Sequence, residues 1–183
     1  MVRTKKIYRE QLLQGAYQLV VDEGFKHFHA RKVAKVIACS TQPIYREFEN
    51  LTIFKTATSE YIIQTVEQFL TDKERSDLPS FSEVICQYAE KKPAEFERFF
   101  LQDETCRPLM RELIGIHFKN LVVSLPEYQT ISSERLDQLF DLFWFYTLGK
   151  AAQRAHAQAD DEELAVHISL NEVTNLFMQE VTS

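Results

Sequence analysis

The sequence predicts an all-α protein, and three observations point to this class. Only 4 glycines occur in 183 residues. The 5 prolines stand at separated positions, where they punctuate helices. Apolar residues also recur at helical spacing: in a first helix expected over residues 7–23, Leu12, Ala16, Leu19 and Val20 form one stripe. A chain of this length can bury a sizeable core, as one domain or as a small one plus a larger one.

Three helices, the last two of them short, are expected in the first 50 residues. The first ends at Gly24, which can take a positive φ without a Cβ clash. The second is expected over 30–37 and the third over 41–47, with Ser40 in the turn between them. Ser40 is a suitable N-cap for the third helix, and Pro43 suits its first turn. Two short helices joined by a tight turn predict a helix-turn-helix unit, whose second helix enters a DNA major groove.

The third helix has two unlike faces. Ile44 and Phe48 share an apolar face at i and i+4, and polar side chains lie opposite. Gln and Arg suit paired hydrogen bonds to adenine and guanine edges, and hydroxyl groups can donate to phosphates. An ordinary amphipathic helix with a solvated polar face is the alternative. The residues expected to contact DNA are Gln42 and Arg46 at base edges, and Thr41 and Tyr45 at phosphates.

Positive charge gathers around this helix. Residues 1–50 hold nine Lys and Arg against five Asp and Glu, a net charge of +4, whereas the remainder carries −10. A local basic patch is enough to engage phosphates, so the overall charge of −6 does not exclude DNA binding. At single positions the alternatives are a solubilising terminus or a solvated lysine. The further residues expected to contact phosphates are Lys5, Lys6, Arg31 and Lys55.

One string of residues carries a family resemblance. It comprises Asp-Glu-Gly-Phe at 22–25, Val-Ala-Lys at 33–35, Ser40, Ile44, and the Tyr-x-x-Phe pair Tyr45 and Phe48. Over residues 7–55 the chain thereby resembles the N-terminal DNA-binding domain of the TetR family of transcriptional regulators. The Tyr-x-x-Phe pair soon after a short second helix is the most specific part. Beyond residue 55 the resemblance is one of architecture only.

The resemblance implies a homodimer that binds a palindromic operator in double-stranded DNA and represses transcription until a small-molecule effector releases it. Three positions depart from the family pattern. Ala38 replaces a usual Gly, His29 a usual Thr or Ser, and Leu51 a usual Lys. The last two changes remove a hydroxyl and a cation suited to phosphate contact, which affects DNA affinity more than fold. They favour an alternative: an activator or co-regulator that depends on a protein partner and has little DNA affinity of its own.

Residues 51–183 are expected to form a helical effector-binding and dimerisation domain after the DNA-binding domain of residues 1–50. A long helix over 51–70 and a polar loop over 71–80 come first, and further helices begin near Pro93 and Pro108. Apolar side chains on these helices either line an effector pocket or simply form a core. The candidate pocket residues are Tyr61, Tyr88, Phe99, Met110, Ile114, His117, Phe118 and Trp144.

The last two helices are expected over 132–157 and 160–181. Residues 139–148 are apolar nearly all the way round, which a helix tolerates only when most of its sides are buried. A second subunit would supply the missing cover, and two helices from each subunit would form a four-helix bundle. The candidate interface residues are Leu139, Phe143, Tyr146, Gly149, Leu170, Leu176 and Phe177.

Several functions are disfavoured by the sequence. There is no run of 18 apolar residues and no apolar stretch after the basic N-terminus, so neither a membrane span nor a secretory signal is expected. Cys39, Cys86 and Cys106 lack metal-type spacing and suit reduced thiols in the cytoplasm. No Gly-rich phosphate loop, CxxC or HExxH occurs, so we expect no enzyme, no metal and no cofactor.

Overall fold

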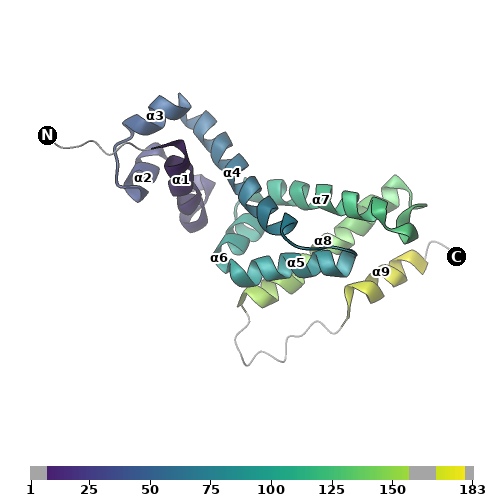
Figure 1. The fold of residues 1–183 in the computed structure, drawn as a ribbon. Helices are drawn as coiled ribbons and strands as arrows, with labels where there is room; N and C mark the ends of the chain where they lie inside the picture. The colour runs from purple at the N-terminus through teal and green to yellow at the C-terminus, as the bar shows by residue number, and fades with distance from the viewer. Residues whose placement is uncertain (1–7, 157–167, 180–183) are drawn as a thin grey trace.

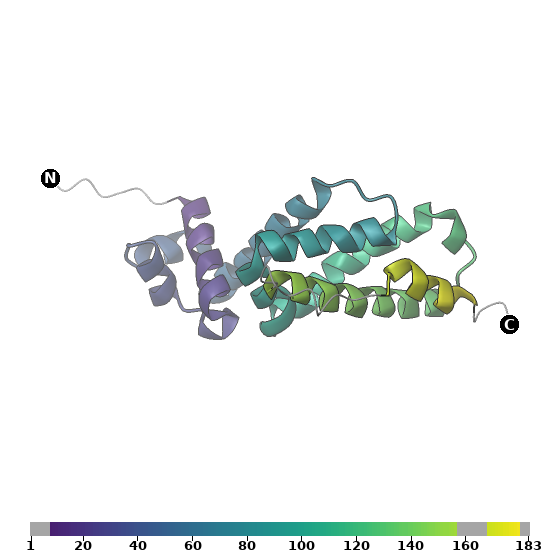
Figure 2. The same cartoon turned by 90° about the horizontal axis from the view of Figure 1, so that it is seen from below.

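The computed structural model describes residues 8–156 and 168–179, and within these ranges the fold is all-α, as predicted. Figure 1 shows a small N-terminal head, an elongated body, and helix α4 running from one into the other. The turn of view in Figure 2 confirms that the head projects from one end of the body. The head contains α1 (Arg9–Glu23), η1 (Phe25–His27), α2 (Ala30–Val36) and α3 (Gln42–Phe48).

The linking helix α4 spans Leu51–Thr71 and leads into a body of stacked helices. Within the described ranges no helix combines the length and hydrophobicity that a bilayer crossing requires. The elements of the body are α5 (Leu78–Lys91), α6 (Pro93–Phe96), η2 (Glu97–Gln102), α7 (Cys106–Ser124), η3 (Pro126–Tyr128), α8 (Ser133–His156) and α9 (Leu170–Gln179).

Local sequence signals explain where several helices begin and end. Gly24 ends α1 with φ +78°, and its N–H donates to the carbonyl of Val20 at 2.8 Å, so the predicted stop is confirmed. Asn50 caps α4, because its side-chain oxygen accepts the N–H of Ile53 at 2.9 Å. Asp77 caps α5 in the same way through the N–H of Ser80 at 2.8 Å.

Some predicted boundaries were wrong. Ser40 does not cap α3; the helix begins one residue later, and its cap residue Thr41 makes no side-chain bond to the first turn. The expected loop over 71–80 is shorter, because Asp77 starts α5 at Leu78. The helix expected from residue 160 begins in the structure only at Leu170. Its two preceding described residues are not helical, and the earlier part of the prediction falls outside the described residues.

The segment after Pro93 also differs from a plain α-helix. It opens as predicted with proline in the first turn, but after Phe96 the backbone widens into the π-helical η2. This element turns Arg98 toward the head, where its Nε donates to the carbonyl of Val21 at 3.0 Å. The local change of helix type thereby positions a contact between body and head.

An aromatic core holds the head together. Phe28 follows η1, and its ring lies 5.3 Å from that of Phe54 in α4. Phe48 of α3 stacks on the same Phe54 ring at 4.5 Å. All three side chains are almost completely buried. The first turns of α4 therefore close the core of the head as well as leading into the body.

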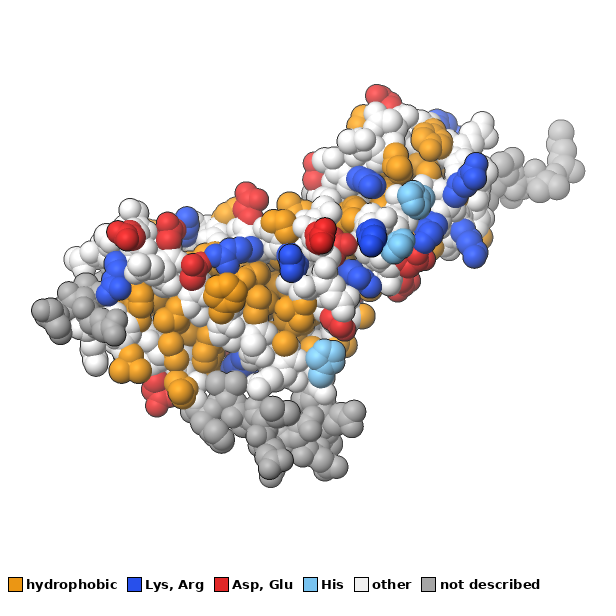
Figure 3. Space-filling view, turned by 180° about the vertical axis from the view of Figure 1, so that it is seen from behind, with side chains coloured by type: hydrophobic (Ala, Val, Ile, Leu, Met, Phe, Trp, Pro, Cys, Tyr) orange, Lys and Arg blue, Asp and Glu red, His pale blue; other side chains and the backbone are white. Residues whose placement is uncertain are grey.

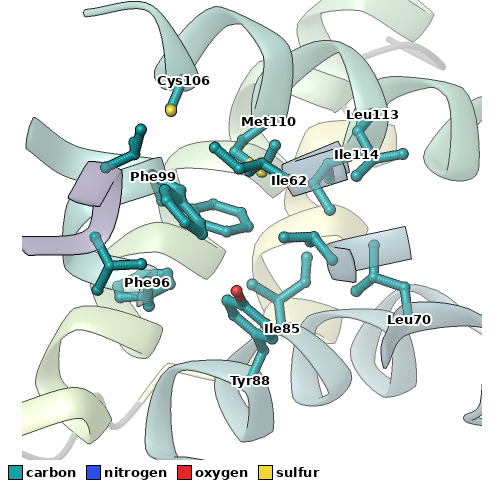
Figure 4. Close-up of a cluster of buried hydrophobic side chains, with 14 of the residues drawn as sticks. Ile62, Leu70, Ile85, Tyr88, Phe96, Phe99, Cys106, Met110, Leu113 and Ile114 are labelled. Atoms are coloured by element: carbon teal, nitrogen blue, oxygen red, sulfur yellow. The ribbon is translucent and has the colours of Figure 1, made fainter. Parts of the chain in front are cut away.

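The core of the body is a second apolar cluster that draws side chains from most of its elements. Figure 4 shows Ile62 of α4, Ile85 of α5, Phe99 of η2 and Ile114 of α7 converging on one another. Each of these side chains is at most 1% exposed. Helix α8 adds a further layer, in which Phe143 stacks on Phe81 at 5.2 Å. Burial of this kind fixes the helices relative to one another.

Candidate nucleic-acid interface

The turn between α2 and α3 is tight and closed by backbone hydrogen bonds. The N–H of Cys39 donates to the carbonyl of Ala34 at 2.9 Å, and Ala38 takes φ +52°. Positive φ is costly for a residue with a Cβ, which explains why a glycine is usual at this position in the resembling family. The turn nonetheless brings α3 back across α2 in the helix-turn-helix order.

Helix α3 separates its side chains as its sequence predicts. Ile44 and Phe48 are almost fully buried in the head. Gln42 and Arg46 are exposed, and Tyr45 is 49% exposed on the flank. The structure thus leaves two long hydrogen-bonding side chains and one phenol on an open surface. Thr41, the remaining residue expected to contact DNA from this helix, is half-buried at its start.

The basic side chains of the head fall into two groups. Some are held within the protein: Lys32 pairs with Glu23, and Arg9 lies 3.7 Å from Glu47 with its guanidinium 4.4 Å above the ring of Phe48. A second group consists of exposed cations that have no ion-pair partner among the described residues. This group comprises Lys26, Arg31, Lys35 and Arg46.

Figure 3 shows blue Lys and Arg and pale-blue His side chains along the head and its junction with the body. Lys35, exposed in the last turn of α2, was not among the residues predicted to contact DNA, although its position beside the turn was visible in the sequence. Lys55 is half-buried, with its ammonium group 5.9 Å from the ring of Phe28. The predicted contacts Lys5 and Lys6 lie outside the described residues.

Two side chains of the body join it to the head. Arg98 reaches the C-terminal end of α1, where its Nε and Nη2 donate to the carbonyls of Val21 and Asp22, both at 3.0 Å. These carbonyls are helix-end groups that lack partners within α1. Asp103 accepts the backbone N–H of Phe25 at 2.7 Å. These contacts between distant parts of the chain carry no local sequence signal.

Gly24 is required at this junction for a second reason. A Cβ at this position would lie 2.8 Å from the carboxylate of Asp103, closer than such atoms approach. Beside these groups a hollow of about 720 Å³ lies between η1, α4 and residues 102–105. The head therefore contacts the body on two sides of this hollow. One side is α4, and the other is formed by the hydrogen bonds that Arg98 and Asp103 make with the head.

Most of the candidate effector-pocket residues form packed core. The side chains of Tyr88, Phe99, Met110, Ile114, Phe118 and Trp144 are at most 5% exposed. Their rings pack on others; that of Phe99, for example, lies edge-on to Tyr17 at 5.5 Å. Tyr61 is half-buried and also contacts Tyr17. His117 differs from them because it lines a hollow of about 330 Å³ at the surface.

The candidate interface residues also divide into buried and exposed ones. Leu139, Phe143 and Leu170 are buried within the chain itself. Tyr146 is half-buried and donates a hydrogen bond to the carbonyl of Ile168 at 2.9 Å. Gly149 is exposed, and a Cβ added there meets nothing within 4 Å.

On α9, Leu176 is exposed, whereas Phe177 is half-buried beneath the guanidinium of Arg135. One side of α8 instead carries Leu142, Phe145, Gly149 and Ala152 at helical spacing, of which Phe145 and Gly149 are exposed and Leu142 and Ala152 are half-buried. Phe145 is 66% exposed, and sequence reasoning missed it because the whole run is apolar. Figure 3 shows an apolar patch on the rear face of the body, where α8 runs.

The chemistry of a metal or thiol site is not supported by the described residues. Within residues 8–156 and 168–179 no three His, Cys, Asp or Glu side chains gather as a metal site would require. All three cysteines are free, and burial raises the pKa of the Cys86 and Cys106 thiols. A raised pKa keeps a thiol protonated and unreactive at neutral pH.

Comparison with known proteins gives likenesses among solved structures. No protein-family model and no curated protein matches the chain. Among solved structures, the chain is similar to SCO7518, a proposed transcriptional regulator of Streptomyces coelicolor A3(2). The two chains share 17% identity with a TM-score of 0.47, over 82% of this chain and 88% of that one.

Proposed function

We propose that this protein is a DNA-binding transcriptional regulator that acts as a homodimer and represses until a small-molecule effector releases it. The observation that carries the proposal is the surface of α3. Ile44 and Phe48 fix this helix to the head, while Gln42, Tyr45 and Arg46 extend from the opposite side. A helix held this way after a tight turn can lie in a major groove and read base edges.

Phosphate contacts are assigned to the groups around this helix. Arg31, Lys35 and Arg46 are exposed and unpaired with any described carboxylate, so DNA phosphates would not have to displace an internal partner. Thr41 and Tyr45 would add hydroxyl donors that fix the register. Lys5 and Lys6 are assigned to phosphates from the sequence alone. Each phosphate neutralised in this way releases counterions, so affinity is expected to fall steeply with salt.

The dimer is proposed to form through α8 and α9. Its central residues are Phe145 and Gly149, which are exposed on α8, and the half-buried Leu142 and Ala152 lie on the same side of the helix. Gly149 lets a partner helix approach closely, since no side chain separates the backbones. Two heads related by a two-fold axis match a palindromic operator whose half-sites lie one helical turn or a multiple of it apart.

Release by an effector requires two arrangements of the heads. An effector can release DNA only if it binds better to the arrangement that misfits the operator. Helix α4, the packing of Tyr17 on Phe99, and the hydrogen bonds of Arg98 and Asp103 are structural connections through which the body would set the position of each head. A change in the body that moves α4 relative to η2 would therefore change the distance between the two reading helices.

Fluorescence anisotropy with purified protein and labelled DNA from beside its own gene tests the proposal. The expected result is specific binding with two subunits per site. Its affinity should fall strongly as salt rises from about 50 to 200 mM, because each phosphate contact releases counterions. The matched variants are Arg46→Ala on α3 and Lys119→Ala, an exposed cation of α7. Specific binding that survives Arg46→Ala, or is lost equally in Lys119→Ala, would contradict the assignment.

A second function is favoured by two positions in the head. His29 begins α2 without a side-chain cap, and Leu51 begins α4 with a half-buried apolar side chain. Neither supplies the hydroxyl or the cation usual there in the resembling family. The protein would then be an activator or co-regulator that reaches DNA with a protein partner. Binding to operator fragments no better than to random DNA would favour this function over independent repression.

A further inference from the structure

A small hollow in the body is lined mainly by hydrogen-bond donors. It has a volume of about 330 Å³ and lies between the segment joining α4 to α5, the start of α5, and the second half of α7. This part of the body is remote from the head (Figure 1). Its walls are formed by Arg75, Phe81, His117, Asn120, Leu121 and Ser124.

Arg75 is a cation without a carboxylate partner. Its guanidinium lies 5.2 Å from the centre of the Phe81 ring, and no Asp or Glu among the described residues lies within ion-pair distance. Burial lowers the pKa of Arg75 below its ordinary value, which reflects the loss of hydration. A half-buried guanidinium normally pairs with a carboxylate, which offsets the loss of hydration. Here the Phe81 ring is the group that faces the guanidinium.

His117 adds a polar atom that is also unpartnered. Its Nε2 is buried and makes no hydrogen bond to any described residue, although the side chain is 13% exposed. The nearest acid is Glu67 of α4, whose carboxylate oxygen lies 3.8 Å away, beyond hydrogen-bond distance. Burial, and then the charge of Arg75, lower the pKa of His117, against the opposite effect of Glu67. An unsatisfied buried nitrogen is uncommon and calls for a partner.

The other walls define what kind of partner fits. Asn120 is exposed, and its amide makes no side-chain hydrogen bond with a described residue. The hydroxyl of Ser124 already donates to the carbonyl of Leu121 at 2.6 Å. Phe81 and Leu121 supply apolar surface beside these groups. The hollow therefore combines one uncompensated cation, an imidazole and an amide with a short apolar wall.

We propose that this hollow binds a small organic anion, whose carboxylate or phosphate pairs with Arg75 and accepts a hydrogen bond from His117. Arg is the residue best suited to hold such groups through two parallel hydrogen bonds. The apolar part of the anion would lie against Phe81 and Leu121. A volume near the lower limit for ligand sites restricts the occupant to a molecule of few atoms.

The same site has a direct connection to α4. Glu67 of α4 and the bound anion would both approach His117, so occupancy changes the interaction between α4 and α7. Because α4 also closes the core of the head, this contact lies on the path from body to head. This regulatory role, in which the anion is the effector, rests on the proposed function. Binding of the anion itself does not depend on that function.

Binding is measured first, without DNA. The full chain is titrated with sodium benzoate, sodium acetate and sodium phosphate at constant ionic strength, with sodium chloride as reference, by calorimetry and by the shift of the unfolding temperature. We expect saturable binding of at least one oxyanion, with benzoate tighter than acetate because of the apolar wall. Phosphate tighter than benzoate would identify a phosphate group as the preferred one and would support the same site.

Variants assign the binding to this hollow. Arg75→Met keeps an apolar stem over Phe81 but removes the charge, and we expect at least a tenfold loss of affinity. His117→Gln should weaken binding several-fold, and it tests the site independently if the first variant folds poorly. The matched control is Arg107→Gln, which removes an exposed cation from α7 outside the hollow. Equal affinity in Arg75→Met, or no binding of any of the three anions beyond chloride, would overturn the proposal.

Operator binding is measured second, in the presence of the best of these anions. Loss of DNA binding in the wild type but not in His117→Gln would link the site to regulation. Anion binding with no effect on DNA would overturn the regulatory role alone. If no specific DNA binding exists while the Arg75-dependent anion binding remains, the proposed function fails and the anion site stands.

Discussion

Asp103 accepts a hydrogen bond from the backbone N–H of Phe25 at 2.7 Å, across 78 positions of sequence. The same carboxylate accepts the N–H groups of Thr105 and Cys106 at 2.9 and 3.0 Å, and so caps the start of α7. One buried side chain thus satisfies donors in both the head and the body. The position of the head relative to the body depends in part on this residue.

Removal of this carboxylate is expected to destabilise the protein. Asp103→Ala leaves three backbone donors unsatisfied, two of them in buried bonds, and should lower the free energy of unfolding by about 3 kcal/mol. Asp103→Asn retains one acceptor oxygen and should lose less. Urea denaturation measures both, with the exposed neighbour variant Glu104→Ala as the control. A loss equal to that of the control would show that the Asp103 bonds contribute nothing.

Arg46 is expected to determine DNA affinity and part of its specificity. Its exposed side chain lies on α3 and is free of any described carboxylate. Arg46→Ala should weaken specific binding by about 1–3 kcal/mol and relax discrimination at one base position. Anisotropy titrations against operator variants measure both effects. A uniform loss across all sequences would assign Arg46 to a phosphate instead of a base.

Replacement of Ala38 by glycine is expected to stabilise the protein. Its φ of +52° costs about 1–2 kcal/mol for a residue with a Cβ, whereas glycine has no such cost. Glycine also increases the conformational entropy of the unfolded chain, and this effect lowers the free energy of unfolding by about 0.4–1 kcal/mol. Ala38→Gly should therefore raise the free energy of unfolding by several tenths to about 1 kcal/mol. Ala152→Gly, in the regular helix α8, is the control and should destabilise.

The Glu83–Arg154 pair is expected to give a pH-dependent contribution to stability. Partial burial raises the pKa of Glu83, but its bonds to Arg154 and Lys150 outweigh this effect and the net pKa is lowered. A carboxyl with a lowered pKa stabilises the fold above its ordinary value of 4.5, and this stabilisation is lost as pH falls through the lowered pKa. Because the groups are about one-third exposed, the effect should stay under about 1 kcal/mol.

The variant Glu83→Gln tests this relationship. We expect it to be less stable than the wild type at pH 7, with the difference shrinking as the pH falls below about 4.5. Thermal unfolding across this pH range gives the comparison. A difference that stays constant with pH would mean that packing, and not charge, accounts for the effect of Glu83.

Phe145 is expected to be central to the proposed dimer. It is 66% exposed on the free side of α8, in line with Gly149 one helical turn later. Phe145→Asp should convert the dimer to a monomer without unfolding it, because the side chain contributes little to the chain's own core. Light scattering after size exclusion measures the mass. Val123→Asp, at an equally exposed apolar position on α7, is the control and should remain dimeric.

Much of the head was predictable because its signals are local. Gly24 ends α1, Pro43 lies in the first turn of α3, and the spacing of Ile44 and Phe48 assigns one side of α3 to the core. Once that side is buried, geometry leaves Gln42 and the other polar residues outside. The prediction that Ser40 caps α3 failed because the helix begins one residue later than its composition suggests.

The body was less predictable because its run of apolar residues has no polar side to orient it. The sequence indicated that residues 139–148 need cover on most sides, but not which neighbour supplies it. In the structure Phe143 packs against Phe81 of α5 in the same chain, and Phe145 is left exposed. Only packing decides between the two, because both are large apolar side chains on one helix.

The sequence by itself determined the helices, the separation of the two faces of α3, and the excess of positive charge around it, because these follow from short-range periodicity and composition. The tertiary structure decided which cations are free, which apolar side of α8 is open, and how the head is held to the body. Arg98 reaches Val21 across 77 positions, and such a contact arises only when distant helices pack together. Arg75 and His117 likewise line one hollow only because the segment between α4 and α5 packs beside α7 there.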